Sequence, residues 1–488
     1  MLQSDSPLPP LVRTAPRGGL LGSPARLTLL FAGLISLAAF LAALFPFEYN
    51  YLWDEGVYLS EAENLLVPEP YYEEFSFRPP LLPIMIHLAS YAVPLDLAAK
   101  LVTALMFAVG VFFLYLLGAK MFGSRAGLIA AGLMASSPYI RHWAHKVMTD
   151  VPSTSFAIIS VYLLVKHVED DDASPWSIFL SGAMLAVSML TRFVMLLAGV
   201  CALCYFLTGR MSLRSVRWYI AGILTPLAPY FVWAQIRYGW FLRPLLMGAV
   251  MVAADPVPGN AYYLKAIAVV AGPVSLLGFL LYQSKIPPLD QHWRDADLPL
   301  LVWLLSFAFY LTSNVHKEVR YIVPAIPPLY LAAGWGFARL QKTWARTAAL
   351  AVAAGLAVFT VFHLSYFDDR AALGEEFLLQ RSAQSCAAAQ YLRSRIGAGE
   401  VIYTNTLPPV VAYCSKKKTR ASSPQDRQFY TSYPRNMRTS GYFVYFKYAA
   451  KEPSQEWLNS RIEFQKDREF GEVILYKYTY QKIPEMGR

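Results

Sequence analysis

A succession of apolar segments, each near the length that crosses a lipid bilayer, constrains this chain most strongly. A spanning helix needs about 20 mostly apolar residues. Only 16% of the 488 residues are charged, against about 25% in soluble globular domains. The sequence therefore predicts a polytopic all-α membrane domain of about eleven transmembrane helices. The candidate segments are 27–46, 97–119, 124–140, 152–167, 176–190, 193–208, 217–236, 262–282, 298–313, 321–338 and 346–366.

The chain changes character after residue 366. Residues 367–488 contain no run of spanning length and are richer in polar and charged side chains. The stretch 380–394 has the pattern of an amphipathic helix, and a second helix is expected from Trp457. Runs of β-branched and aromatic residues starting at Glu400, Gly441 and Glu472 predict strands. We therefore divide the chain into a membrane domain, 1–366, and a small α/β domain, 367–488.

The basic residues indicate the orientation of the chain. If the N-terminus is cytoplasmic, alternating spans place four basic groups on that side, as the positive-inside rule requires. These groups are Arg13, Arg17 and Arg26; Lys120 and Arg125; Arg210, Arg214 and Arg217; and Arg339, Lys342 and Arg346. The extracytoplasmic side of this multi-pass cell-membrane protein then receives 47–96, 141–150, 316–320 and the C-terminal domain. Residues 81–93 are too short to cross and are expected to form an interfacial or re-entrant helix.

Two groups of charged residues lie in the outer-face segment 47–96. Charges close to the bilayer are costly and therefore mark candidate functional sites. Asp54 and Glu55 follow the first apolar segment. A carboxylate there could take a proton from a hydroxyl group. Alternatively, Asp54 could cap a helix that begins at Gly56, and Glu55 would interact favourably with the N-terminal end of its dipole. Arg78 precedes two prolines. Its guanidinium could bind phosphate oxygens or anchor the chain at the interface.

A third cluster surrounds Asp150, which follows His145 and Lys146 and precedes Pro152. Asp150 could serve an ordinary role at a helix start, or orient an acceptor. It could also share a divalent cation with Asp54, because carboxylates suit Mg²⁺ or Mn²⁺. Two acids of unknown separation do not establish a metal site.

The fourth cluster is the loop from His316 to Tyr321, which precedes a proline-rich apolar segment. His316, Lys317 and Arg320 could neutralise a phosphate leaving group, and Glu318 could pair with a neighbouring base. The alternative, positively charged anchoring at the interface, is disfavoured because this loop faces away from the side where such charges collect.

Other motifs bound the range of functions. The chain has no phosphate-binding loop, dinucleotide fingerprint or His-Glu-x-x-His zinc motif, and no basic tract with interleaved aromatics that would bind nucleic acid. Cys201 and Cys204 lie in an apolar segment and should act as small hydrophobes. Cys386 and Cys414 could form a disulfide if their domain faces an oxidising compartment, but sequence alone does not show whether they are close.

Taken together, the four clusters resemble those of the GT-C superfamily of integral-membrane glycosyltransferases. The run from Asp54 to Tyr58, followed by Arg78-Pro79-Pro80-Leu81, resembles protein O-mannosyltransferases and the aminoarabinose transferases of lipid A. The His316–Tyr321 loop is more similar to the dolichyl-phosphate-mannose-dependent mannosyltransferases. The resemblance covers roughly residues 27–340. It implies an inverting transfer of a sugar from dolichyl or undecaprenyl phosphate to a hydroxyl of a protein, lipid or glycan.

The resemblance also implies roles for individual residues. Asp54 would be the catalytic base that activates the acceptor hydroxyl. Glu55 and Asp150, the other two residues expected to be catalytic, would shape the sugar and acceptor site. The residues expected to bind the donor phosphate are Arg78, His316, Lys317, Arg320 and Tyr321. Those expected at the sugar or acceptor are Tyr58, His145, Lys146 and Glu318. The isoprenoid would lie in an apolar groove near 324–328.

Three alternatives remain beside this interpretation. A transporter or lipid flippase would show polar residues near mid-span and broken helices in paired halves, whereas the charges here sit at segment ends and no internal repeat is visible. A non-catalytic subunit could present the outer domain to a partner. An oligosaccharyltransferase-like enzyme would move a whole glycan, but the outer domain lacks a Trp-Trp-Asp acceptor motif.

Overall fold

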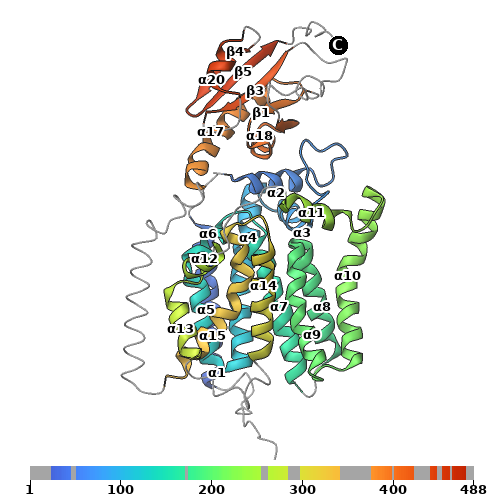
Figure 1. The fold of residues 1–488 in the computed structure, drawn as a ribbon, viewed down its shortest axis with the longest axis vertical. Helices are drawn as coiled ribbons and strands as arrows, with labels where there is room; N and C mark the ends of the chain where they lie inside the picture. Colours follow the sequence, from blue (N-terminus) through green and yellow to red (C-terminus); the bar gives the residue numbers. More distant parts are fainter. Residues whose placement is uncertain are drawn as a thin grey trace, which may run out of the picture.

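The computed structural model describes most of the chain as a helical bundle with a small α/β domain at one end (Figure 1). The described residues are 23–45, 51–170, 174–253, 262–283, 297–340, 375–397, 400–421, 440–447, 453–461 and 464–479. The predicted segment 346–366 lies outside these ranges. The basic residues Arg13, Arg17, Lys342 and Arg346 do so as well.

Within the described residues, five helical stretches are long and apolar enough to cross a membrane by length and composition. They are Arg26–Leu44 within α1 (Ser23–Leu44), α4 (Leu95–Phe122), α7 (Asp150–Glu169), α10 (Leu213–Tyr238) and Val319–Ala338, which joins the 3₁₀ turn η2 (Val319–Ala325) to α15 (Ile326–Ala338). Shorter apolar helices complete the bundle: α8 (Pro175–Thr191), η1 (Phe193–Gly199) with α9 (Val200–Leu207), α13 (Pro273–Gln283) and α14 (Asp297–Ser313). The described part of the chain thus agrees with a polytopic helical domain.

Two predicted segments are divided in the structure. The 124–140 segment becomes α5 (Ser124–Ser136) and α6 (Pro138–His145), because Ser137 is extended and caps the second helix through its hydroxyl. The 262–282 segment becomes α12 (Tyr262–Ala271) and α13, separated by Gly272 at φ 76°. Glycine tolerates this left-handed conformation where other residues do not.

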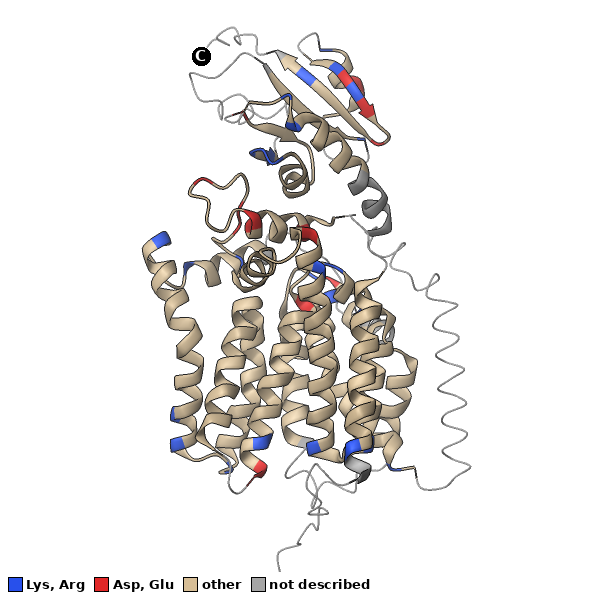
Figure 2. Cartoon of the chain, turned by 180° about the vertical axis from the view of Figure 1, so that it is seen from behind, with Lys and Arg blue, Asp and Glu red and all other residues tan. Residues whose placement is uncertain are grey.

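Four short helices lie between the bundle and the C-terminal domain: α2 (Trp53–Glu63), α3 (Leu81–Ala89), α6 and α11 (Arg243–Ala253) (Figure 1). With nine residues and a rise of about 1.5 Å per residue, α3 is too short to cross a bilayer, as predicted. Lys and Arg gather at the opposite end of the bundle, whereas acids and bases mix near the short helices (Figure 2).

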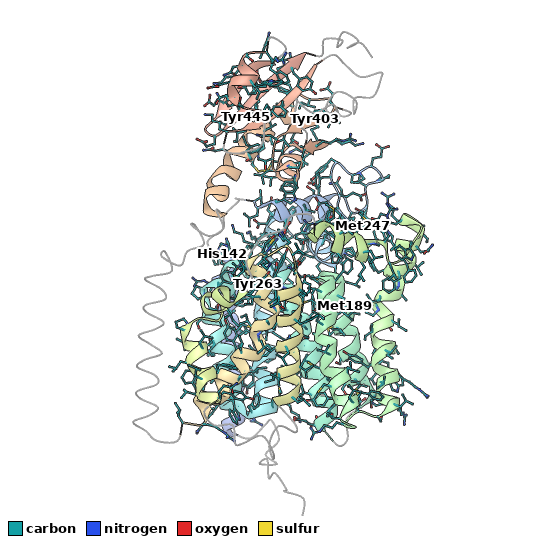
Figure 3. All side chains as sticks on the ribbon, in the orientation of Figure 1. His142, Met189, Met247, Tyr263, Tyr403 and Tyr445 are labelled. Atoms are coloured by element: carbon teal, nitrogen blue, oxygen red, sulfur yellow. A yellow bond between two sulfur atoms is a disulfide. The ribbon has the colours of Figure 1, made fainter. Side chains whose placement is uncertain are left out.

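The C-terminal domain contains a five-stranded sheet in the order β2-β1-β3-β5-β4. The first strand pairs in parallel with β2 and β3, and the pairs β3–β5 and β4–β5 are antiparallel. The strands are β1 (Ile402–Thr404), β2 (Thr419–Ala421), β3 (Ser440–Phe446), β4 (Phe464–Phe470) and β5 (Val473–Thr479). The helices are α17 (Glu375–Arg393), α18 (Pro408–Ser415) and α20 (Gln455–Asn459). Tyr403 and Tyr445 belong to the core beneath α20 (Figure 3).

Close helix packing in the bundle depends on glycines. A Cβ on Gly182 in α8 would lie 2.0 Å from the carbonyl oxygen of Tyr219 in α10, and one on Gly222 in α10 would lie 2.0 Å from that of Phe179 in α8. Small residues allow two helix backbones to approach in this way inside a membrane. The pairing of α8 with α10 therefore requires glycine on both sides.

We predict that Gly182→Ala destabilises the protein by about 1–3 kcal/mol, because the added methyl group forces α8 and α10 apart. Gly132→Ala in α5 is the matched control, since a Cβ there meets nothing within 4 Å. The melting temperature of the detergent-solubilised protein measures both effects. Equal melting temperatures for the two variants would contradict the packing argument.

Candidate active site

The carboxylate of Asp54 lies between two arginines from distant parts of the chain. Its Oδ1 is 2.8 Å from Nη2 of Arg78, and its Oδ2 is 2.6 Å from Nη1 of Arg320. Only 13% of the Asp54 side chain is exposed. Burial by itself would raise the pKa of Asp54, but Arg78 and Arg320 outweigh it and hold that pKa well below its usual range. The predicted meeting of these clusters is present in the structure.

Glu55, the next residue, is engaged differently. It is fully buried, and its two oxygens accept the backbone N–H groups of Leu52 (2.9 Å) and Val147 (2.8 Å). Lys100 Nζ lies 3.6 Å away. Burial raises the pKa of Glu55, but Lys100, Lys146 and the two N–H groups together lower it. Glu55 thus caps the start of α2 and joins it to the residues before α7. The helix begins at Trp53 rather than at Gly56, so Glu55 fills the capping role that the sequence suggested for Asp54.

A short chain of contacts positions Arg78. Its Nε is 2.5 Å from Oε2 of Glu74, and its Nη1 donates to the Tyr58 hydroxyl at 3.2 Å. The backbone N–H of Glu74 in turn donates to Glu61 Oε1 at 2.9 Å. Glu61 is fully buried in α2, and burial raises its pKa to about 8. Arg78 is therefore held by a loop that folds back onto the helix carrying Asp54.

The loop from His316 to Tyr321 converges on the same place. Arg320 Nε pairs with Glu318, whose Oε1 also contacts His316 Nε2 at 2.9 Å. Burial raises the pKa of Glu318, but Arg320 and His316 prevail and lower it to about 2. Tyr321 lies beneath the Arg320 guanidinium, with its ring centre 5.7 Å from Cζ. This loop therefore places Arg320 beside Asp54, with the Nε of Arg320 already paired to Glu318.

Asp150 begins α7 and forms an ion pair that the sequence analysis missed. Its Oδ1 binds Arg192, which follows α8. Its Oδ2 has no hydrogen-bond partner in the described part of the chain. Arg192 also lies over the Tyr321 ring, 4.6 Å from its centre. A signal was present, since Arg192 separates two predicted spans and the predicted orientation places it on the outer side, where basic residues are unusual.

The remaining predicted residues lie around this cluster in different ways. Tyr58 contacts both Arg78 and, at 3.4 Å, the Thr149 hydroxyl. The His145 ring approaches the Ala43 carbonyl of α1 at 3.0 Å, and its own carbonyl accepts Lys100. Lys146 is buried near Glu55, and Lys317 is half-buried in its loop. His145 and Lys146 thus lie around the N-terminal turn of α2, whereas Tyr58 faces the charged cluster.

The arrangement bears on the proposed divalent cation. Both oxygens of Asp54 already contact guanidinium groups, and the described residues contain no cluster of three His, Cys, Asp or Glu side chains that could hold a metal ion. A cation shared by Asp54 and Asp150 would have to replace an arginine at Asp54. The arginine side chains around Asp54 suit an anion better than a metal ion.

Comparisons with known proteins fit this geometry. Residues 78–233 match the sequence model of the dolichyl-phosphate-mannose-protein mannosyltransferases, and residues 258–373 match that of the Alg9-like mannosyltransferase family. No curated protein sequence matches the chain. The two matches confirm the mixed resemblance, since one covers Arg78 and Asp150 and the other covers the His316–Tyr321 loop.

Solved structures share the fold across most of the chain. ArnT from Cupriavidus metallidurans, bound to undecaprenyl phosphate, has a TM-score of 0.69 and 15% identity, covering 93% of this chain and 98% of that one. The oligosaccharyltransferase AglB from Archaeoglobus fulgidus, bound to an inhibitory peptide and dolichol phosphate, has a TM-score of 0.57 and 12% identity over 86% and 69% of the two chains. The mycobacterial arabinofuranosyltransferase AftD has a TM-score of 0.59 and 14% identity over 94% and 40%.

A helical membrane bundle with this fold, matched by two mannosyltransferase sequence models, defines an integral-membrane glycosyltransferase. The two partial family matches and the shared fold support a membrane glycosyltransferase of the GT-C type.

We predict that Arg192→Gln destabilises the protein by about 3–5 kcal/mol, because it leaves the buried Asp150 carboxylate without its charged partner. The double variant Asp150→Asn/Arg192→Gln should recover much of that loss, since neither charge then remains. Thermal melting of the four proteins of this double-mutant cycle measures the coupling. Additive losses would show that the pair is not coupled.

Proposed function

We propose that the chain is an inverting glycosyltransferase that moves a sugar from a polyprenyl phosphate to a hydroxyl of a protein, lipid or glycan. The observation that carries the proposal is the carboxylate of Asp54 held between Arg78 and Arg320. A base and two phosphate-binding cations are the groups that this reaction requires. Two solved structures of the same fold contain a polyprenyl phosphate, undecaprenyl phosphate in ArnT and dolichol phosphate in AglB, which supports this donor class.

The reaction is a single displacement at the anomeric carbon. Asp54 accepts the proton of the acceptor hydroxyl, whose oxygen forms the new bond to that carbon. The bond between the carbon and the donor phosphate oxygen breaks, and its electron pair stays on the released polyprenyl phosphate. Arg78 and Arg320 stabilise the charge that grows on this phosphate, so they bind the transition state more strongly than the ground state.

The ion pairs of Asp54 imply an exchange of partners. An incoming phosphate that binds Arg78 and Arg320 takes donors away from the carboxylate. Asp54 then loses the cations that keep its pKa low, and it becomes a stronger base when the donor is in place. Proton removal is therefore linked to donor binding.

We place the reaction on the extracytoplasmic face and the N-terminus in the cytoplasm. Lys120 lies in the last turn of α4, and Arg125 and Arg214 lie in the first turns of α5 and α10. Lys and Arg gather at the end of the bundle away from the C-terminal domain (Figure 2). The positive-inside rule supports a cytoplasmic location for that end. The charged cluster and the C-terminal domain would then share the outer side.

We expect Asp54→Asn to abolish transfer and Arg320→Gln to lower kcat by about 100- to 1,000-fold, the usual loss when a transition-state donor is removed. The assay incubates purified protein with a panel of polyprenyl-phosphate sugars and follows sugar release and transfer. Arg237→Gln is the control, because this arginine is 52% exposed and pairs with Glu73. Wild-type turnover in Asp54→Asn would remove Asp54 from the role of base.

The exchange of partners predicts a difference between two pH profiles. Asp54 must be ionised to act, so activity falls as the pH drops through its pKa. That pKa is low in the free enzyme and higher once the phosphate has taken the arginines. We therefore expect the acid limb of kcat, which reports the donor complex, at a higher pH than that of kcat/KM, which reports the free enzyme. If the acid limbs of the kcat and kcat/KM profiles coincided, the proposed exchange of partners at Asp54 would be wrong.

A further inference from the structure

The face of α2 that does not carry Asp54 packs against α18 of the C-terminal domain. Residues 55–62 of α2 and all eight residues of α18 are buried, and α18 makes extensive contact with α2. The closest approach is at Gly56, where a Cβ would lie 2.8 Å from Val410 N and 2.9 Å from the Pro409 carbonyl carbon. Two residues after Asp54, the backbones of the two helices are therefore in direct contact.

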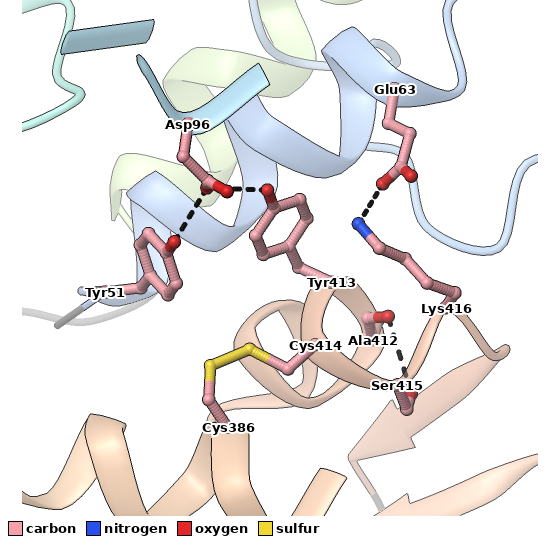
Figure 4. The surroundings of a disulfide bond; sticks show 9 residues. All are labelled: Tyr51, Glu63, Asp96, Cys386, Ala412, Tyr413, Cys414, Ser415 and Lys416. Carbon is pink, nitrogen blue, oxygen red and sulfur yellow. Dashed lines mark hydrogen bonds and ion pairs between the residues drawn. A yellow bond between two sulfur atoms is a disulfide. The ribbon is translucent and has the colours of Figure 1, made fainter. Parts of the chain in front are cut away.

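Polar contacts fix α18 at both ends of α2. The hydroxyl groups of Tyr413 in α18 and Tyr51, just before α2, both donate to Asp96 Oδ1 at 2.7 Å (Figure 4). At the other end, Lys416 pairs with Glu63, the last residue of α2. Asp96 belongs to α4, so the first contact joins α18 to the bundle beside the start of α2, and the second joins α18 to the last residue of α2.

The helix α18 is itself held firmly within its domain. Cys414 forms a disulfide with Cys386 of α17 (Figure 4). The sequence alone did not decide whether these two cysteines are bonded. Leu407 and Lys416, on either side of α18, adopt left-handed backbone conformations at φ 52° and 58°. Such conformations persist in residues other than glycine only where the surroundings enforce them. A helix fixed in this way can act as a rigid support.

We propose that the C-terminal domain is a positioning element of the active site, in which α18 holds α2 so that Asp54 meets Arg78 and Arg320. This inference rests on the proposed function. Its physical basis is that a displacement of about 1 Å at a reacting group can lower the rate about 100-fold. Glu55 secures the first turn of α2 from the bundle side, and α18 secures its whole length from the other. Tyr413 and Lys416 are positioning residues that touch neither the base nor the phosphate-binding arginines.

The test uses Tyr413→Phe and Lys416→Ala in the full-length protein. We expect kcat to fall about 10- to 100-fold, while binding of undecaprenyl phosphate stays within about threefold of wild type. Hydrogen exchange over residues 53–63 should become faster, a readout that does not depend on activity. Lys447→Ala is the matched control, because it removes a lysine from an ion pair with Glu469 in the same domain without touching α2. It should leave both readouts unchanged.

Swapping the charges of Lys416 and Glu63 distinguishes a positioning role from a general loss of structure. The double variant Lys416→Glu/Glu63→Lys should restore the exchange protection of residues 53–63 and most of kcat, whereas each single reversal should lower both. If the variants exchange at wild-type rates and keep wild-type kcat, the inference is wrong. The same holds if activity falls only in proportion to unfolded protein. If wild-type protein transfers sugar from no polyprenyl-phosphate donor while exchange still responds, the proposed function fails and the support of α2 by α18 stands.

Discussion

The sharing of the Asp54 carboxylate between two arginines is the interaction on which the rest of the candidate site depends. Charges that leave water for the edge of a bilayer must be paired, because an unpaired buried ion is strongly destabilising. Asp54 forms ion pairs with Arg78 and Arg320. The Nε of Arg320 also pairs with Glu318, and Asp150 pairs with Arg192. These acids and arginines neutralise one another. A phosphate can therefore enter by replacing a carboxylate at an arginine that is already desolvated.

Much of this site follows from the sequence because its cause is simple. Charges beside apolar segments are costly and need partners, and the distribution of basic residues places Asp54, Arg78 and Arg320 on one side. The resemblance to known families rests on the same residues. What the sequence does not reveal is which partner each of these side chains contacts. It does not show that Glu55 caps α2, or that His145 approaches α1 rather than the charged cluster.

The elements missed from the sequence share another cause. Lys100 lies inside a long apolar helix, where its contact with Glu55 becomes visible only when α4 packs beside α2. The strand β4 carries five consecutive exposed residues at the edge of its sheet, so it lacks the alternation that marks a strand. The eight residues of α18 are buried on all sides and show no helical periodicity. In each case tertiary contacts, rather than local pattern, decide the structure.

The contact between α2 and α18 also has a consequence for the order in which the protein is made. The proposed base precedes most of the described bundle in the sequence, whereas α18 follows every described helix of the bundle and emerges from the ribosome after them. Insertion of the bundle and completion of the proposed catalytic centre are therefore separate events. A nascent chain with its bundle inserted would reach the proposed turnover only after α18 had packed against α2.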